Sequence, residues 1–584
     1  MQINILHRPE TGRGREKIFQ MEQEMVHKLG FKTTILATVP ALEDNHTIDL
    51  MKMYHDKFGD ELGISFHILD TPSIAKLVGF KEVAFWLYDE PSKRKVIRFL
   101  VDRFKELFGF EPKSAASYHF DASSLKVLSK ECPSIKTVVG GCFEEGVRVY
   151  HGCNNSWYLF NEGMPWAAWY PSRSHALRPA KDKKDAFDIV AVPHLSRDLV
   201  LAYEGRNDFW ASHPPNVQRG KGNLGENCPY DKNLIDQHRY QERFNEGYSY
   251  LNVFVSAQWL VWNHNSEEPP EVSISLYRQQ LEYIKSLVDK GEAEVQTMDE
   301  FGRWYRKKFP VNHREVALAK EILYGSGKHY LWYIDPYMRV LVDFFQGCSI
   351  GDLRPFISQV PVTTGPDGSH GMFASYPYLI HSQHRSGYLN HCFDGSRTTA
   401  ILKHDGAEVD LADVECKCDE VFENQRGFVS KPARVRFGEK VTATLKTRFL
   451  FEKSGEVIIE RELLSIEGSD NQQIEITEYF KGCYGVTEYP QDMSSVKLSI
   501  DGNPRKNLKY KYKRQSLSSE KVKFVQATIP PINTIVGFKS ADGKHWKGTI
   551  TEGLLFSPYY TFTLTRTMKP GETSRICLYL KAIK

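Results

Sequence analysis

The sequence lacks the patterns that mark membrane-spanning, nucleotide-binding and nucleic-acid-binding proteins. Its 584 residues contain no run of 18 apolar residues, so we expect no transmembrane helix and no membrane insertion. It contains no Walker, dinucleotide-binding or GxSxG pattern, so we expect no nucleotide cofactor. The 76 Lys and Arg residues nearly balance the 73 Asp and Glu residues, and the net charge of +3 gives no electrostatic case for a nucleic-acid partner.

The N-terminus also lacks the features of a secretory signal. It begins with a short strand-like stretch and continues as a basic amphipathic one, without a long apolar core or a small-residue cleavage site. We therefore expect a cytoplasmic protein, or a periplasmic or secreted one if a signal peptide has been removed. The ten cysteines are scattered, and the only close pair, Cys416 and Cys418, is not a CxxC motif, so we expect mostly reduced thiols.

The pattern of apolar residues changes near residue 312. Before it, short apolar segments alternate with segments of helical spacing. This repeated β-then-α order predicts a parallel sheet that closes into a (β/α)7–8 barrel over residues 1–312, with residues 83–87 among its strands. Residues 313–330 have the spacing of a helical linker. Over residues 331–584, apolar residues alternate with period two between Gly-containing turns, which predicts a large antiparallel β-sandwich.

Polar side chains follow several predicted barrel strands, at the ends where the chemistry of such barrels lies. Neutral imidazole and carboxylate groups are common ligands of zinc and similar divalent ions. The alternative for each Asp is an N-cap of the following helix, and the alternative for a single His is an ordinary buried or surface residue. The candidates are His7, Glu10, His67, Asp70, His119, Asp121, His194 and Asp198.

Residues 150–172 carry seven aromatic residues at irregular spacing, which predicts a loop over the barrel mouth. Sugar rings have an apolar face that stacks on Trp and Tyr, so this loop is a candidate substrate-binding surface. The alternative is that its aromatic side chains only hold a long loop in place by packing. The Gly-rich loop after it is a candidate lid that carries charged groups to orient a substrate. The substrate-binding candidates are Trp157, Trp166, Trp169, Tyr170, Arg206, Asp208, His213 and Trp259.

Four stretches of the first 310 residues, namely 59–67 (GDELGISFH), 110–128, 169–193 and 276–304, together resemble the polysaccharide deacetylase (NodB-like) family. The first is similar to the family's HEIGxHxxxH stretch and the second to its third motif. The third is similar to its PYxPs…iveiP passage and the fourth to its closing unit. This family is grouped with seven-stranded β/α barrels that include some glycosidases, and the all-β half resembles the sandwiches appended to barrel glycosidases.

The resemblance implies a hydrolase with a carboxylate base, an acid histidine and a divalent metal, zinc being the first candidate. The family's paired Asp after strand one is replaced here by His7-Arg8-Pro9-Glu10, and of its His-rich stretch only His67 aligns. The site would therefore be rebuilt from nearby residues. The expected metal ligands are His7, His67 and Asp70, and the expected catalytic residues are Asp121, Asp198, His119, His194 and Glu10.

The sequence therefore predicts a carbohydrate-active hydrolase that acts on a poly- or oligosaccharide at the barrel mouth. Glycoside hydrolysis would need two carboxyl groups about 5–10 Å apart, whereas deacetylation would need a metal-activated water. One alternative is a catalytically inactive barrel that serves as a glycan-binding module. Another is a sugar lyase or isomerase on the same barrel.

Overall fold

The computed structural model describes most of the chain. The described residues are 1–12, 15–141, 160, 163–204, 230–256, 260, 270–358, 360, 376–382, 395–422, 426–452, 454–486, 489–490, 495–504, 515–552 and 559–583. The chain divides into two compact units. The barrel unit comprises Met1–His313, Glu321–Gly325 and Pro361–Ser375, and the sandwich unit comprises Arg314–Lys320, Ser326–Val360 and Tyr376–Lys584.

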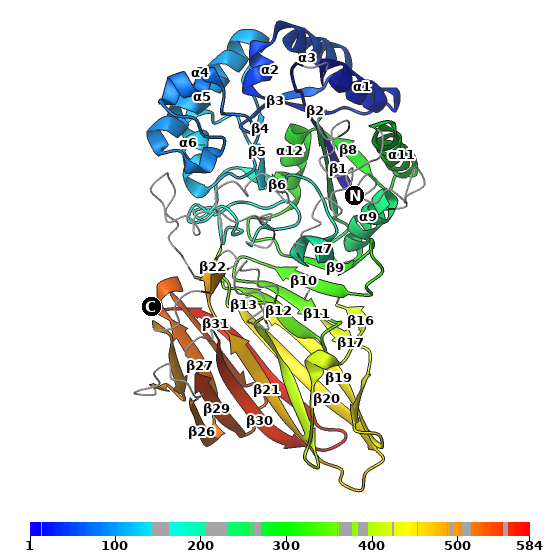
Figure 1. The fold of residues 1–584 in the computed structure, drawn as a ribbon, viewed down its shortest axis with the longest axis vertical. Coiled ribbons are helices and arrows are strands. Elements are labelled where there is room, and N and C mark those ends of the chain that lie inside the picture. The colour runs from blue at the N-terminus through cyan, green and yellow to red at the C-terminus, as the bar shows by residue number, and fades with distance from the viewer. Residues whose placement is uncertain are drawn as a thin grey trace. The chain divides into compact units, whose positions relative to one another are not determined.

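The barrel unit is built on a parallel eight-stranded sheet, as the sequence predicts (Figure 1). Seven strands follow the order β6-β5-β4-β3-β2-β1-β7, and β8 pairs with the first half of β1 beside that path. The strands are β1 (Gln2–Arg8), β2 (Thr34–Ala37), β3 (Glu61–Ser65), β4 (Ser114–Ala116), β5 (Thr137–Gly141), β6 (Val190–Pro193), β7 (Tyr250–Ser256) and β8 (Glu294–Gln296).

The barrel is nearly closed by hydrogen bonds between β7 and the segment that follows β6. The Ser196 amide donates to the Asn252 carbonyl at 3.0 Å, and the Asn252 amide donates to Ser196 Oγ at 3.0 Å. The Asn252 side chain donates to the carbonyls of Pro193 at 2.7 Å and His194 at 3.1 Å. The backbone and the side-chain NH2 group of the buried Asn252 are thus paired, and the same bonds fix the backbone at His194.

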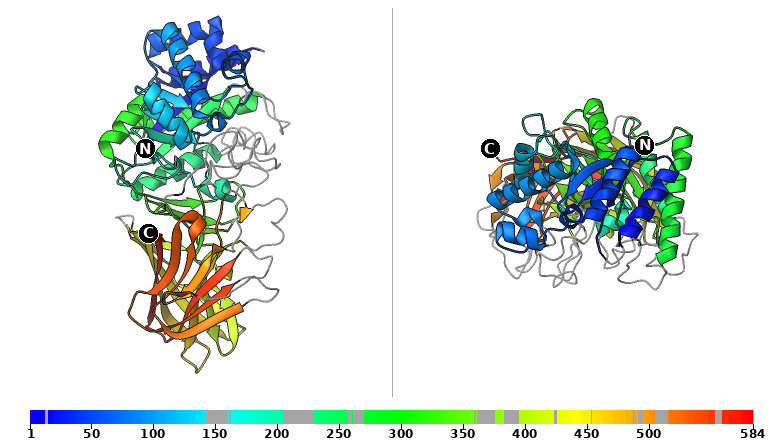
Figure 2. Two further views of the ribbon diagram at one scale, coloured as in Figure 1. Left: turned by 90° about the vertical axis from the view of Figure 1, so that its left-hand side faces the viewer. Right: turned by 90° about the horizontal axis from the view of Figure 1, so that it is seen from above.

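Helices lie on the outside of the barrel (Figure 2). Ile3 and Ile5 of β1 pack with Met25 and Val26 of α1 and with Leu281 of α11 in one apolar layer. At the amino-terminal end, Gly302 of α12 lies against Thr137, where any larger side chain would collide with the Thr137 hydroxyl. The helices are α1 (Arg15–Lys28), α2 (Val39–Glu43), α3 (Asn45–Phe58), α4 (Pro72–Val78), α5 (Glu90–Phe108), α6 (Ala122–Glu131), α7 (Leu199–Glu204), α9 (Tyr230–Tyr240), α11 (Pro270–Asp289) and α12 (Met298–Lys308).

The sandwich unit contains two large antiparallel sheets (Figure 1). One consists of β9 (Glu315–Lys320), β10 (His329–Ile334), β11 (Arg339–Asp343), β12 (Ser349–Arg354), β13 (Ile380–His381), β14 (Arg397–His404), β15 (Ala407–Asp410), β21 (Ile474–Gly482), β26 (Gln515–Val522), β29 (Trp546–Glu552) and β30 (Tyr560–Met568). The other consists of β16 (Cys418–Val421), β17 (Gly427–Ser430), β18 (Ala433–Phe437), β19 (Val441–Glu452), β20 (Glu456–Glu467), β24 (Lys497–Ile500), β25 (Asn503–Pro504), β27 (Phe524–Ile529), β28 (Thr534–Ser540) and β31 (Thr573–Ala582). A separate hairpin pairs β22 (Gly485–Val486) with β23 (Tyr489–Pro490).

The two sheets stack face to face around an apolar core. One cluster joins Leu402 and Ile476 of the first sheet to Leu445 and Leu463 of the second. The period-two pattern of the sequence matches the burial along β19 and β20, where buried residues alternate with more exposed ones. In the described part of the chain, no helix is long and apolar enough to cross a membrane.

Two local predictions are wrong. Residues 313–330 were expected to form a helical linker, but they contain β9 and the start of β10. These two strands pair antiparallel, with His329 opposite Lys320 at one end and Ile334 opposite Glu315 at the other. Cross-strand pairing and burial of Val316 and Ala317 override the helix-compatible spacing of this segment. Residues 83–87 form no strand; they contain the short 3-10 helix η1 (Phe85–Leu87).

Candidate functional site

Four side chains from different strands meet inside the barrel at the carboxyl ends of the strands. Arg8 is the last residue of β1, His67 and His194 follow β3 and β6, and Phe254 lies on β7. The ring centroids of His67 and His194 are 5.3 Å apart, and that of Phe254 is 4.1 Å from His194 and 5.7 Å from His67. Phe254 pairs with Leu6 of β1, and Arg8 lies two residues after Leu6, so Arg8 is on the same side of the sheet as Phe254. This is the end of a β/α barrel at which active sites form.

His67 is the central group of this cluster, and its side chain is almost completely buried. Its Nδ1 is hydrogen-bonded to Ser65 Oγ at 2.7 Å, while its Nε2 has no hydrogen-bond partner in the described structure. Burial, followed by the nearby Arg8 and His194 charges, holds the pKa of His67 well below its usual value. The imidazole is therefore neutral at physiological pH. In the tautomer whose Nδ1 donates to Ser65, Nε2 is free to accept a proton.

Arg8 also forms an ion pair with a carboxylate, that of Glu10. Its Nη2 donates to Glu10 Oε1 at 3.3 Å, and Arg15 Nη1 lies 3.6 Å from Glu10 Oε2. Both Arg8 and Glu10 are buried, so this pair acts in a low-dielectric surrounding where charge interactions are stronger than in water. The structure thus brings the predicted residues His67, His194 and Glu10 into one region.

Tyr118, Arg8 and Phe254 belong to the same site but were not among the predicted site residues. The Tyr118 ring is half-buried, and its centroid lies 4.4 Å from that of His67, edge to face. Arg8 and Tyr118 are the sequence neighbours of predicted His7 and His119. The strand ends were therefore identified correctly, but the side chain that faces the interior at each was not.

His7 points away from this cluster, into the layer between β1 and the outer helices. Its Nε2 is 2.8 Å from the hydroxyl of Tyr277 on α11, and burial lowers its pKa to about 3. Successive residues of a strand face opposite sides, so His7 and Arg8 cannot both face the barrel interior. His119 likewise lies against Trp86 of η1, at a centroid distance of 6.0 Å, and burial lowers its pKa to about 4.

The predicted metal-ligand set is wrong. His7 and His67 lie on different sides of the sheet, and Asp70 is exposed. Within the residues that the structure describes, no group of three or more His, Cys, Asp and Glu side chains is placed to hold a metal ion. These residues do not fit the expected zinc, and no step of the chemistry below is derived through one.

Asp121 and Asp198 have the capping role that the sequence left as their alternative. Asp121 accepts from the Ser124 amide at the start of α6 and pairs with buried Lys93 at 3.1 Å. Asp198 accepts from the amides of Val200 at 2.8 Å and Leu201 at 3.0 Å at the start of α7, and its other oxygen accepts from the Ile322 amide at 3.0 Å. Every oxygen of these two carboxylates is engaged, so neither is placed to exchange protons with a substrate.

The burial of Asp198 leads to a testable prediction about the pH dependence of stability. Burial raises its pKa from 3.8 to about 7, against the opposing effect of three amide donors. A carboxyl group whose folded pKa is raised adds stability below its unfolded pKa, and this is lost as the pH rises through the folded pKa. The free energy of unfolding of the wild type should therefore fall by roughly 3 kcal/mol between about pH 4 and pH 7 relative to Asp198→Asn. Parallel urea titrations of both proteins measure the difference, and equal pH dependence would contradict it.

Trp169 and Tyr170 are part of the barrel's packing and were wrongly expected at its mouth. Trp169 pairs with Ala191 of β6, its ring lies over Gly140 of β5, and its indole donates to the Ala176 carbonyl at 2.8 Å. The Tyr170 hydroxyl donates to the Phe309 carbonyl, just after α12, at 3.1 Å. Trp166 is also buried. The other predicted substrate-binding residues, Trp157, Arg206, Asp208, His213 and Trp259, lie outside the described residues.

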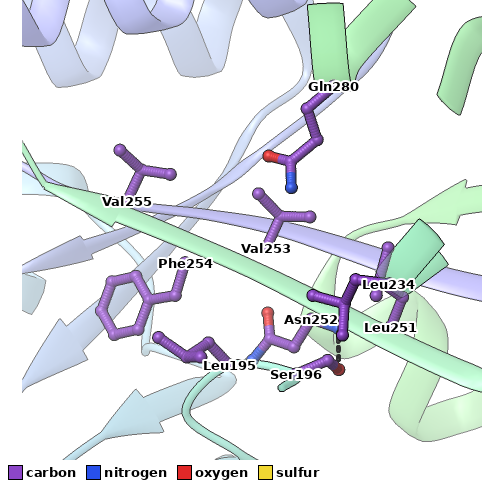
Figure 3. Close-up of a pocket in the computed structure, with 9 residues that line it drawn as sticks. All are labelled: Leu195, Ser196, Leu234, Leu251, Asn252, Val253, Phe254, Val255 and Gln280. Atoms are coloured by element: carbon purple, nitrogen blue, oxygen red, sulfur yellow. Dashed lines mark hydrogen bonds between the residues drawn. The ribbon is translucent and has the colours of Figure 1, made fainter. Parts of the chain in front are cut away.

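A small pocket lies where the barrel closes (Figure 3). It has a volume of about 10 Å³ and is lined by Leu195 and Ser196, by Gln280 of α11 and by residues of β7. Phe254 and Val253 extend to opposite sides of β7, and Gln280 reaches from the helix toward Val253. The pocket is about the size of one water molecule, so it marks the seam of the barrel rather than a substrate site.

A larger hollow of roughly 650 Å³ lies at the amino-terminal end of the barrel, lined by Phe110 and by charged residues. These charges pair with one another: Lys113 with Asp299 at 3.4 Å, and Lys105 with Glu111 at 3.4 Å. This end of a β/α barrel generally serves stability. The carboxyl end is therefore the candidate functional site.

Comparison with known proteins places the barrel unit in a family. Residues 36–327 match the family described as "Domain of Unknown Function with solved-structure structure (DUF3863)". No curated protein matches the sequence. Similar solved structures include a Parabacteroides distasonis protein provisionally named a glycoside hydrolase/deacetylase, with a TM-score of 0.44 and 16% identity over 63% of this chain and 87% of that one.

Two further similar structures are more distant. The 4-α-glucanotransferase of Thermococcus litoralis has a TM-score of 0.31 and 8% identity over 100% of this chain and 99% of that one. A Mycobacterium smegmatis protein provisionally named a polysaccharide deacetylase has a TM-score of 0.28 and 9% identity over 53% of this chain and 90% of that one.

Proposed function

The chain belongs to the DUF3863 family, and we propose that it is a carbohydrate-active hydrolase whose reaction takes place at the carboxyl ends of its barrel strands. One observation carries the proposal: Arg8, Glu10, His67 and His194 are all buried at this end. The interior of a β/α barrel is normally filled with apolar side chains. Burying four ionisable groups there costs stability, which is typical of a catalytic site.

The arrangement favours attack of water on an acyl carbonyl, such as the acetyl group of a modified sugar. His67 Nε2 takes a proton from the water while the water oxygen bonds to the carbonyl carbon. Arg8 stabilises the negative charge that forms on the carbonyl oxygen, and Glu10 holds the guanidinium in place. The carbon–leaving-group bond then breaks, the proton on His67 passes to the sugar oxygen or nitrogen, and the carboxylic acid is released.

Cleavage of a glycosidic bond is less well supported than acyl hydrolysis. It needs two carboxyl groups on opposite sides of the bond. Asp121 and Asp198, the two acids expected to supply this chemistry, cap helices. Among the acids that the sequence analysis placed at this end and the structure describes, Glu10 is the one that contacts Arg8.

Two observations support a carbohydrate as the substrate. The four sequence stretches similar to polysaccharide deacetylases lie in the barrel unit, and His67 is the last residue of the first of them. The half-buried Tyr118 ring stands next to His67, where a sugar ring could stack on it.

An assay on matched oligosaccharides tests the proposal. We expect acetate to be released from acetylated chito- and xylo-oligosaccharides, with no new reducing ends, and no reaction with the unacetylated sugars. New reducing ends without acetate would establish glycoside hydrolysis instead, and binding without turnover would establish a glycan-binding module. If a metal chelator abolished acetate release, the step assigned to His67 and Arg8, which uses no metal ion, would be contradicted.

A further inference from the structure

Glu22 is a buried acid that the reaction described above does not use. It lies on α1, its side chain is 0% exposed, and neither of its carboxylate oxygens has a hydrogen-bond partner within the described part of the chain. A carboxylate taken out of water without donors or a close counter-ion loses its hydration without a compensating interaction. Glu22 therefore does not persist there as an unpaired ion.

The groups around Glu22 connect it to the candidate site. Arg15 lies seven residues earlier on α1, on the same helix face, and pairs with Glu10 at 3.6 Å. The Glu10 charge raises the pKa of Glu22 and the Arg8 charge lowers it. The titratable groups behind β1 are His7, its partner Tyr277 on α11, His27 on α1 with its partner Asp60, and Tyr54 on α3. Arg8 and Glu10 lie at the end of β1.

These surroundings favour the neutral form of Glu22. Burial raises its pKa well above the usual value, and the negative charge of Glu10 raises it further, while Arg8 opposes both effects. Ionising Glu22 would place a second negative charge beside the Arg8–Glu10 pair. That charge would compete with Glu10, and with any negative charge on a substrate, for the Arg8 guanidinium.

We propose that Glu22 is a neutral carboxylic acid behind β1, so that it adds no negative charge beside the Arg8–Glu10 pair and leaves the Arg8 guanidinium available to the substrate. Glu22 is a positioning residue, because it faces the helix layer and acts through Arg8. At high pH it would lose its proton to solvent, and the added negative charge would weaken stabilisation of the reacting carbonyl oxygen. The effect on turnover rests on the proposed function, whereas the protonation state of Glu22 does not.

Glu22→Gln tests the proposal because glutamine has the same shape but cannot ionise. We expect the wild type to lose kcat as the pH rises through the titration of Glu22, and E22Q to lack this decline. Glu24→Gln, an exposed acid on the same helix, should keep the wild-type profile. Identical profiles for the wild type and E22Q would overturn the proposal.

Infrared difference spectroscopy gives a second readout that needs no substrate. At neutral pH, E22Q should lack a carbonyl band of a protonated carboxylic acid that the wild type and E24Q both show. If the wild type and E22Q showed the same carboxylic-acid bands, Glu22 would be ionised in the wild type and the proposal would be refuted. If no carbohydrate is hydrolysed, the band still decides the state of Glu22.

Discussion

Replacing His67 by glutamine should lower kcat for acetate release by about 10²–10⁴-fold, the usual cost of losing a general base. The glutamine side chain would retain a polar group of similar length but could not take the proton of the attacking water. The helices and strands around it should be unaffected, because His67 follows β3 and its side chain and amide are hydrogen-bonded to Ser65, two residues away. Initial rates on an acetylated oligosaccharide, together with a thermal melt of each protein, provide the measurement.

The control is His46→Gln, which changes an exposed histidine on α3 and should leave the rate unchanged. The pH dependence gives an independent check. Because the pKa of His67 is lowered by burial and by Arg8, the imidazole stays neutral below the pH at which an ordinary histidine gains a proton. The wild-type rate should therefore persist below about pH 6. Turnover of H67Q within a few-fold of the wild type would remove His67 from the mechanism.

The architecture was predictable because it depends on long-range patterns. The β-then-α order of the first half predicts the parallel barrel, and the period-two alternation of the second half predicts the antiparallel sheets. The prediction of a helix over residues 313–330 was wrong because the short apolar spacing of this segment suits both a helix and a strand. There the pairing of β9 with β10, which no local pattern records, decides the structure.

The site was only partly predictable, and β1 shows why. All of its residues from Ile3 to Arg8 are buried, since helices cover one face of the sheet and the barrel interior fills the other. Without a polar–apolar alternation, the sequence gives no sign of which of His7 and Arg8 faces inward. The strand end was identified, but the side chain was wrong by one residue.

Glu22 could have been found from the sequence. It shares a face of α1 with Phe19 and Val26, at spacings of three and four residues, and both of these are buried. An acid flanked on its helix face by two buried apolar residues is unusual. The buried roles of Trp169 and Tyr170 had no such sign, because aromatic residues in an irregular segment are equally compatible with packing and with sugar binding.

Replacing Arg461 by methionine should destabilise the sandwich unit by about 3–5 kcal/mol. Arg461 on β20 donates through Nε to Glu478 Oε1 on β21 at 2.8 Å and through Nη1 to Thr447 Oγ1 at 3.1 Å. Both members of this ion pair are fully buried, and the two strands belong to the two different sheets. Without Arg461, Glu478 would be left as an unpaired acid between the sheets. Chemical denaturation of the full chain, followed by a signal from the sandwich unit, measures the loss.

The double variant Arg461→Met/Glu478→Met separates an unpaired charge from simple loss of packing. It should be more stable than R461M alone, because neither charge of this pair remains. R461M should also recover stability at low pH: burial already raises the pKa of Glu478, and removing Arg461, which opposes this effect, raises it further. Arg434→Met, which breaks an exposed pair with Glu467, should cost less than about 1 kcal/mol. A double variant no more stable than R461M would mean that packing around Arg461, rather than the unpaired Glu478, accounts for the loss.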